Sequence, residues 1–420
     1  MNNKKLFVNI GSLMGISENY PNRPLKGAEM SRIDKIENAY LSVEGDTIID
    51  YGMMSELGEL SAIYKNYDNI YDVNKRIIIP GFIDTHTHIV FASWREDEFI
   101  MKIQGIPYEE IAKKGGGILN SAKKVQEKSE NELFDLALKR INEVISYGTV
   151  ALEIKSGYGL SLESELKMLK VIKKLKEYTN LPIKSTFLGA HAFPIEYKDD
   201  REGYIDLLIS EMLPKVVDEG LADYVDVFCD EGFFTIDETD KILNAANKFG
   251  LKPKIHVSEM SNNGGVQLGI AHNALSVDHL ERITDEEIRA LLLSKTLPTV
   301  LPQVSFFLKI PYAPARKMVD AGLPIVIASD YNPGTSPSGN LQFAISLATI
   351  YQKLMPEETI NAVTYNAAFA LELEKQLGSI EKGKKASFLI LNSDVTNLNF
   401  FPYHFASNKV DKVIINGEIG

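Results

Sequence analysis

Short apolar runs and amphipathic stretches alternate through the middle of the chain. Eight runs rich in β-branched residues predict buried strands, over residues 77–83, 149–155, 183–189, 224–229, 253–257, 274–277, 297–301 and 324–329. Between most of them, apolar residues spaced three and four apart predict helices, for example over 131–147, 162–178 and 236–249. Strands that alternate with helices indicate an α/β fold with a parallel sheet. Eight such repeats in roughly 250 residues predict a (β/α)8 TIM barrel.

Both ends of the chain show a different pattern, of short strands and turns. Strands are predicted over residues 5–10, 39–43 and 47–51 near the N-terminus, and over 386–391 and 410–415 near the C-terminus. Gly45 and the pair Asn416-Gly417 supply turn residues beside them. We therefore expect a small β-sandwich domain built from residues 1–76 and 377–420, with the barrel formed by residues 77–376.

The composition is that of a soluble globular protein, with 45% hydrophobic and 24% charged residues among 420. The formal net charge of −12 gives no general attraction to nucleic acid or to anionic membranes. A single cysteine, Cys229, excludes a disulfide framework, and no apolar run is long enough to span a bilayer. The first ten residues lack a secretory signal pattern, so we expect a cytoplasmic protein.

Five of the seven histidines fall at the ends of predicted barrel strands, namely His86, His88, His191, His256 and His279. In an extended chain the side chains of residues i and i+2 share a face, so His86 and His88 can converge on one metal ion. Such a pair by itself could also be a polar surface pair. Because the site of a TIM barrel lies at the C-terminal ends of its strands, five histidines there favour a metal centre.

The order of these residues, with Asp330 at the end of the eighth strand, resembles the amidohydrolase superfamily. Within it, the chain is similar to the imidazolonepropionase family over nearly its whole length. The similarity is carried by Arg95 and by the segments 80–91, 98–99, 105–111, 115–118, 153–159, 187–192, 226–232, 312–316 and 328–335. It implies a hydrolase that opens the cyclic amide of 4-imidazolone-5-propanoate to N-formimidoyl-L-glutamate in histidine degradation. Ser93 and Trp94 depart from the family pattern.

The resemblance further implies a mononuclear metal site. Its ligands are His86, His88, His256 and Asp330, and they hold one Zn²⁺ or Fe³⁺ ion per subunit with a position left for water. Two-metal members of the superfamily use a bridging lysine or carboxylate near strand four, where this chain has Cys229-Asp230. Lys155, at the end of strand two, is expected to have a structural role instead.

Catalytic and substrate-binding residues follow from the same resemblance. The expected catalytic residues are Glu259, His279 and Asp330, with the proton moved by Glu259 or His279. The expected substrate-binding residues are Arg95, Tyr108, Tyr158, His191, Glu259, Asn332, Gly334 and Thr335. Arg95 suits the propionate group because a guanidinium forms bidentate, charge-assisted pairs with carboxylates.

Simpler alternatives exist for single residues and for the whole chain. Arg95 could form a surface ion pair with Glu96 or Glu98. Glu259 could be a solvated loop acid, and His279 could be hydrogen-bonded to Asp278. The protein could also be a deaminase of the same fold acting on a nucleobase-like ring, or a scaffold without its metal. The resemblance itself implies a hydrolase that forms a homodimer.

Overall fold

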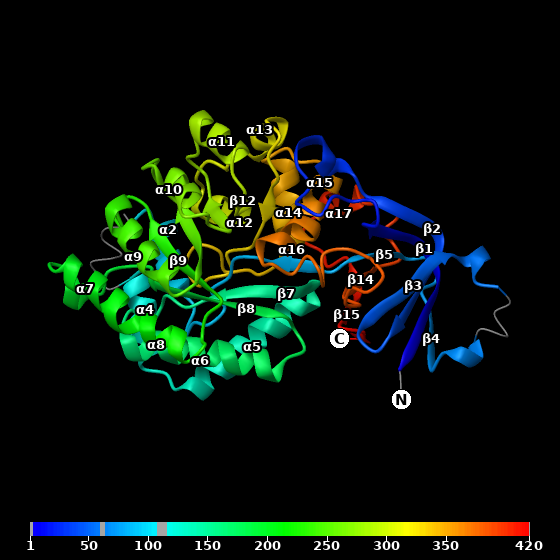
Figure 1. Ribbon diagram of the computed structural model, residues 1–420, viewed down its shortest axis with the longest axis horizontal. Helices are drawn as coiled ribbons and strands as arrows, with labels where there is room; N and C mark the ends of the chain where they lie inside the picture. The colour runs from blue at the N-terminus through cyan, green and yellow to red at the C-terminus, as the bar shows by residue number, and fades with distance from the viewer. Residues whose placement is uncertain (1–2, 59–63, 107–115, 420) are drawn as a thin grey trace.

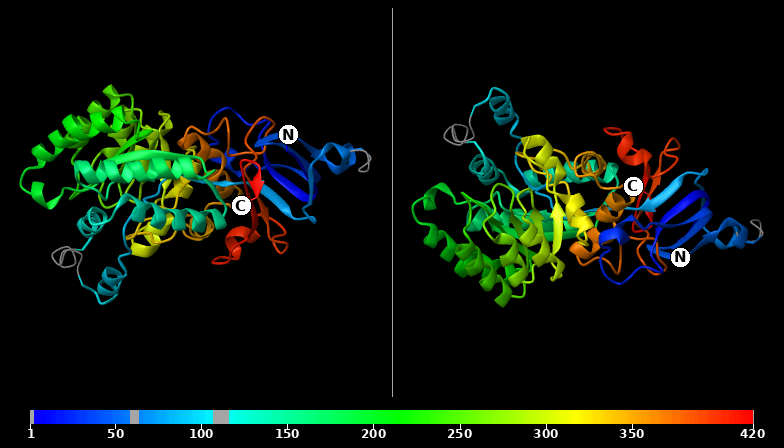
Figure 2. Two further views of the ribbon diagram at one scale, coloured as in Figure 1. Left: turned by 90° about the horizontal axis from the view of Figure 1, so that it is seen from below. Right: turned by 90° about the horizontal axis from the view of Figure 1, so that it is seen from above.

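Two eight-stranded sheets organise the computed structural model, which describes residues 3–58, 64–106 and 116–419 (Figure 1). One sheet forms the barrel, and the other is built from both ends of the chain. Figure 2 shows the blue N-terminal strands and the red C-terminal strands together at one end of the molecule, away from the green barrel helices. The predicted α/β fold class is confirmed.

The barrel strands follow one another in sequence order and are parallel. They are β6 (Phe82–Asp84), β7 (Thr149–Lys155), β8 (Ile183–Ala190), β9 (Tyr224–Cys229), β10 (Lys252–Val257), β11 (Ser276–His279), β12 (Leu297–Val300) and β13 (Val326–Ile327). An isolated parallel bridge between Thr87 and Tyr331 joins the segments that follow β6 and β13. This bridge places the ends of the first and last strands side by side.

Helices surround the barrel (Figure 1). They are α2 (Glu96–Ile103), α4 (Ile118–Gln126), α5 (Glu130–Ser146), α6 (Leu162–Tyr178), α7 (Arg201–Leu207), α8 (Leu213–Asp218), α9 (Ile236–Lys248), α10 (Gly265–Ala271), α11 (Asp285–Leu292), α12 (Pro302–Leu308), α13 (Ala315–Asp320), α14 (Leu341–Ile350), α15 (Pro356–Val363), α16 (Tyr365–Ala370) and α17 (Phe400–Tyr403).

Helix α5 shows why these segments are helical. The hydroxyl of Ser129 accepts a hydrogen bond from the backbone N–H of Glu132, whose carboxylate accepts one from the N–H of Ser129. This reciprocal cap satisfies two backbone donors at the start of the helix. Further along, Leu133, Ala137 and Ile141 recur every four residues and are fully buried against the core. The apolar stripe therefore faces the barrel.

The second sheet combines residues from the two ends of the chain. Its strands are β1 (Lys4–Ile16), β2 (Asp34–Glu44), β3 (Thr47–Met53), β4 (Asn69–Asp72), β5 (Ile77–Pro80), β14 (Phe388–Leu391), β15 (Val410–Ile415) and β16 (Glu418–Ile419). Phe7 of β1 and Phe388 of β14 pack edge to face in its core, with ring centroids 5.1 Å apart. Pairing of β5 with both β1 and β14 joins the two ends.

One strand prediction is wrong. Residues 77–83 do not form a single barrel strand, because the chain changes sheet at Gly81: β5 belongs to the mixed sheet and β6 to the barrel. A Cβ atom on Gly81 would lie 2.3 Å from a methyl carbon of Val150, so the chain passes this point only without a side chain. Both strands are completely buried, and an apolar run therefore looks the same in either sheet.

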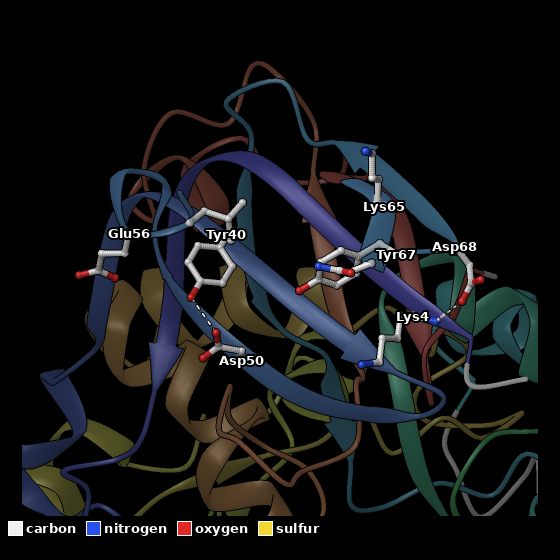
Figure 3. A pocket seen from close by; sticks show the side chains of 9 residues that line it. Lys4, Tyr40, Asp50, Glu56, Lys65, Tyr67 and Asp68 are labelled. Carbon is white, nitrogen blue, oxygen red and sulfur yellow. Dashed lines mark hydrogen bonds between the residues drawn. The ribbon is translucent and has the colours of Figure 1, made fainter. Parts of the chain in front are cut away.

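A cavity of about 660 Å³ lies on the mixed sheet and is lined in part by Lys4, Tyr40, Asp50, Tyr67 and Asp68 (Figure 3). Some of its polar groups bond to one another, since the hydroxyl of Tyr40 donates to Asp50 at 2.8 Å and the backbone N–H of Lys4 donates to Asp68 at 2.8 Å. No histidine is among its lining residues. Elsewhere, none of the helices in the described ranges is both long enough and apolar enough to cross a membrane.

Candidate metal centre and active site

Closure of the barrel brings His86 and His88 next to Asp330. The backbone N–H of Asp330 donates to the carbonyl of His86 at 3.0 Å, and the N–H of His88 donates to the carbonyl of Tyr331 at 2.9 Å. As a result, Oδ1 of Asp330 lies 3.2 Å from Nε2 of His88 and 3.5 Å from Nε2 of His86. Asp330 adopts a left-handed backbone with φ of +52°, a conformation that costs energy for a residue with a side chain.

His256, on β10, faces the same point from across the barrel. Its Nε2 lies 3.0 Å from Nε2 of His86, while the Nδ1 atoms of the two rings contact carboxylates, Asp226 at 3.0 Å and Asp278 at 2.6 Å. A carboxylate accepts a hydrogen bond from an Nδ1–H group, so in both neutral rings the proton is on Nδ1. Each Nε2 atom then carries a lone pair, and the two lone pairs face each other. Two lone pairs at this distance repel unless a cation lies between them.

The surroundings of these groups also fit a metal ion. Burial and then the positive charge of Lys155 hold the pKa of His86 well below its usual value, and burial does the same for His88. Neutral imidazoles are the form that binds metals. Oδ1 of Asp330 is buried and has no hydrogen-bond partner among the described residues. Ligand atoms of His86, His88 and Asp330 lie within 4.8 Å of one another, and so do ring nitrogens of His86, His256 and His279.

A layer of buried charges lies beneath the cluster. Lys155, with no exposed side-chain surface, contacts Glu153 at 2.6 Å and Asp226 at 2.8 Å. Lys254 lies 3.9 Å from Asp278 in the same layer. These residues meet because neighbouring positions of parallel strands point to the same side, and Lys254 pairs in register with Asp226. Lys155 thus compensates the carboxylate that orients His256.

His279 faces two buried acids. Its Nδ1 lies 3.7 Å from Glu259 and 3.9 Å from Glu281. Asp278 binds His86 through Oδ2, while its Oδ1 and Nδ1 of His279 have no hydrogen-bond partner among the described residues, so the alternative that pairs Asp278 with His279 is wrong. His279 and Leu280 have φ of +88° and +73°, and two consecutive strained residues hold the imidazole at the end of β11.

The electrostatics of this group favour neutral side chains. Burial lowers the pKa of His279 to about 3. Burial and then the charges of Glu281 and Asp330 raise the pKa of Glu259 well above its usual range, and burial raises the pKa of Glu281 to about 8. Because only 7% of the Glu259 surface is exposed, the prediction of a solvated loop acid is wrong.

Asp230 holds the loop that carries Glu259. Its carboxylate accepts the backbone N–H groups of Glu259 at 2.9 Å, Met260 at 3.0 Å and Ser261 at 3.0 Å, and also the Ser261 hydroxyl at 2.5 Å. Asp230 is 98% buried, with 2% of its surface exposed. The carboxylate also accepts the backbone N–H of Glu231 at 2.7 Å, and the four bonds to residues 259–261 fix the loop and thereby the position of the Glu259 side chain.

Arg95 lies against the loop that follows Asp330. The terminal guanidinium nitrogen of Arg95 occupies the space beside the α-carbon of Gly334, where an added Cβ would lie 0.9 Å away. Its side chain is 8% exposed and its Nε lies 3.8 Å from Glu98. The alternative of an ion pair with Glu98 is thus correct in its partner, but the pair is buried and does not lie on the surface. Asn332 connects this loop to the cluster, because its amide donates to the carboxylate of Asp330 at 2.8 Å.

The same asparagine shapes the loop itself. The side-chain oxygen of Asn332 accepts the backbone N–H groups of Gly334 at 2.7 Å and Thr335 at 2.8 Å. The hydroxyl of Thr335 in turn accepts the Asn332 amide at 2.8 Å. The predicted residues Asn332, Gly334 and Thr335 are therefore held together as one turn beside Asp330.

Two further predicted residues border the cluster. The ring of His191 stacks on that of His88 with centroids 5.3 Å apart, and its Nδ1 contacts the carbonyl of Gly157 at 2.9 Å. The ring of Tyr158 lies 5.8 Å from His88 and 5.3 Å from His191, and the side chain is buried. Tyr108, also predicted to bind substrate, lies outside the described residues.

Sequence reasoning missed the roles of four buried carboxylates. Asp226 and Asp278 contact His256 and His86, Glu281 faces His279, and Asp230 holds the loop of Glu259. A signal for two of them was present, because Asp226 interrupts the apolar strand β9 and Asp278 precedes His279 on β11. A charged residue in a fully buried strand must have a partner, although the pattern does not identify that partner.

The chain is similar to known proteins over its full length. Residues 77–420 match the model of the Amidohydrolase family. Two relatives named imidazolonepropionase, from Christiangramia forsetii and Flavobacterium johnsoniae, are each 50% identical over 414 residues, which cover 99% of this chain and 99% of each relative. Among solved structures, E. coli guanine deaminase superposes with a TM-score of 0.73 at 12% identity, covering 100% of this chain and 99% of the other, and so shares the fold.

Proposed function

The chain belongs to the amidohydrolase family, and we propose that within it the protein is an imidazolonepropionase. It hydrolyses the cyclic amide C–N bond of 4-imidazolone-5-propanoate and yields N-formimidoyl-L-glutamate. Water adds to the ring carbonyl carbon, the bond from that carbon to the ring nitrogen breaks, and the nitrogen takes up a proton. The observation that carries the proposal is the full-length likeness to relatives of that name.

The metal site is proposed to consist of His86, His88, His256 and Asp330. Their facing Nε2 lone pairs and the unpartnered Asp330 oxygen support it. A bound Zn²⁺ or Fe³⁺ ion supplies Lewis acidity and lowers the pKa of a water molecule, so that a nucleophile exists near neutral pH. The absence of a lysine after β9 supports a single ion per subunit.

Glu259 and His279 are proposed to move the protons, and Asp330 to act with them. Burial and the neighbouring acids raise the pKa of Glu259 well above its usual range, which favours the protonated acid that can donate a proton to the leaving ring nitrogen. Because His279 is neutral, its imidazole can accept a hydrogen bond or a proton from the attacking water. Asp230 keeps Glu259 in reach of the cluster.

Arg95 is proposed to bind the propionate of the substrate. Its buried guanidinium lies at the loop of Asn332, Gly334 and Thr335, which is anchored on Asp330. Tyr158 and His191, which border His88, would contact the ring. The role of Tyr108 in substrate binding stays a prediction.

The proposal also includes the native metal, the oligomeric state and the location of the protein. We expect zinc or iron as the native metal, a homodimer, and a cytoplasmic location. A deaminase of the same fold is the less favoured alternative, because a neutral nucleobase does not need the buried cation of Arg95.

The direct test is consumption of the imidazolone by protein loaded with zinc or iron. His256→Ala should abolish turnover and weaken metal binding, which elemental analysis measures after dialysis. His404→Ala is the matched control, since the His404 side chain is exposed and contacts Ser407 and Phe400, which are not among the proposed site residues. Normal turnover by His256→Ala would contradict the proposed metal site, and ammonia release from guanine instead of ring opening would favour the deaminase.

A further inference from the structure

One face of helix α2 carries charged residues toward the protein. Arg95, Glu98 and Lys102 are spaced three and four residues apart, so they share one side of the helix. The opposite side carries Ile100 and Ile103, which are 51% and 63% exposed. Although Glu96 and Asp97 are exposed in the first turn, the helix thus turns Arg95, Glu98 and Lys102 toward the protein and two isoleucines outward, which is unusual for a surface helix.

The two cations on this face meet at the same residue. The guanidinium of Arg95 packs against the α-carbon of Gly334, and Nζ of Lys102 donates to the carbonyl oxygen of Gly334 at 3.4 Å. Gly334 follows Asp330 by four residues on the loop that borders the cluster. The Lys102 amine is thus placed next to the position proposed for the substrate carboxylate.

Glu98, the acid on this face, lies 3.8 Å from Nε of Arg95 and offsets the charge of Lys102 only in part, since the pKa of Lys102 stays lowered. Glu98 accepts hydrogen bonds from the backbone N–H of Gly117 at 3.1 Å and from the side chain of Asn120 at 3.2 Å. Across the described ranges, Lys102 forms no ion pair. An unpaired, half-buried lysine is unusual in a protein with a net charge of −12.

The arrangement is electrostatically unfavourable in the free protein. Burial and then the positive charge of Arg95 lower the pKa of Lys102. Glu98 acts in the opposite direction, but its effect on the pKa of Lys102 is smaller than those of burial and Arg95. A further anion placed between the two cations would relieve their remaining repulsion. Their chemistry is complementary, since a guanidinium grips both oxygens of a carboxylate and an ammonium acts as a point charge.

We propose that Lys102 is a second cation for the substrate carboxylate and that it determines, together with Arg95, the preference for anionic substrates. This inference rests on the proposed function, because it assigns Lys102 to the propionate end of the same substrate. Lys102 is a binding residue that recognises charge, distant from the bond that breaks.

A purely structural role for Lys102 makes a different prediction. If its hydrogen bond to the Gly334 carbonyl only supports the loop, the loss of Lys102 would disturb every substrate equally, charged or neutral. A pair of substrates that differ in one charge separates the two roles. The imidazolone propanoate and its propionamide have the same ring and nearly the same size, and only the first carries a carboxylate.

The experiment measures kcat and KM for both substrates with the metal-loaded wild-type enzyme, Lys102→Met, Lys102→Gln and Lys102→Arg. Lys170→Met is the matched control, because Lys170 pairs with Glu219 on the outside of the barrel. For the acid, Lys102→Met and Lys102→Gln should lower kcat/KM about tenfold, mainly through KM. For the amide the change should stay below about twofold, and Lys102→Arg should retain most of the activity on the acid.

An equal loss for acid and amide, or no loss for either, would overturn the proposal. The outcome is separate from that of the proposed function: if the wild-type enzyme opened neither ring, the assigned activity itself would fail, before any variant was compared.

Discussion

Replacing Gly334 by alanine should weaken the proposed interaction of Arg95 with the substrate carboxylate, although no charged residue is mutated. The added Cβ would lie 0.9 Å from the terminal nitrogen of Arg95, 2.0 Å from its central carbon and 2.6 Å from Nε. Gly334 does not have a positive φ, so the backbone accepts alanine without strain. The whole effect must therefore come from displacement of the Arg95 side chain.

The magnitude follows from what Arg95 is proposed to do. A hydrogen bond to a charged group contributes about 1.5–3 kcal/mol, and a bidentate pair contains two. The lower figure gives a loss of about 3 kcal/mol, or a little over a hundredfold in kcat/KM. The loss should appear mostly in KM, because the propionate lies away from the bond that breaks.

The assay compares kcat/KM for the wild-type enzyme, Gly334→Ala, Arg95→Ala and the double variant. We expect both single variants to lose about a hundredfold and the double variant to lose no more than Arg95→Ala alone, since both changes remove one interaction. Metal content should be the same in all four proteins. If the double variant lost the sum of the two single effects in free energy, or if Gly334→Ala had normal activity, Gly334→Ala would not act through Arg95.

Further predictions concern the groups around the histidines. Asp226→Asn should weaken metal binding about tenfold to a hundredfold because it removes the acceptor that orients His256, as a chelator competition would measure; unchanged affinity would contradict this. Asp230→Asn should lower kcat about tenfold and leave the metal content unchanged, because an amide is a weaker acceptor than a carboxylate for the N–H groups of the Glu259 loop. An unaltered kcat would show that Asp230 does not position Glu259. The pKa of Glu281, raised by burial from 4.5 to about 8, means that the native metal-free protein binds a proton that the unfolded chain releases. Its free energy of unfolding should therefore fall as the pH rises from about 4.5 to about 8, by at most about 1.4 kcal/mol per pH unit. Glu281→Gln, which keeps an acceptor for the Ser305 hydroxyl, should flatten that dependence in urea titrations at pH 5 and pH 8; the same slope in both proteins would exclude Glu281 as its source.

Local sequence patterns were sufficient to predict most strands and helices of the barrel. Helix α6 and strands β7 and β9 have the predicted bounds, because each is a buried strand or an amphipathic helix with one apolar pattern. The pairing of His86 with His88 also needs only the two-residue repeat of an extended chain. The change of sheet at Gly81 was not predicted, because an apolar sequence pattern indicates a buried strand but does not indicate which of two sheets the strand joins.

The sequence by itself determined the repeating α/β pattern, the histidines at strand ends and the kinds of side chain available for chemistry. These are properties of neighbouring residues, and short-range geometry expresses them directly. Only the tertiary structure decided that Asp226 and Asp278 orient the ring nitrogens of His256 and His86, and that Arg95 fills the space left by Gly334. Such contacts join residues far apart in the chain, and their distances depend on strand register and barrel closure, which one sequence does not specify.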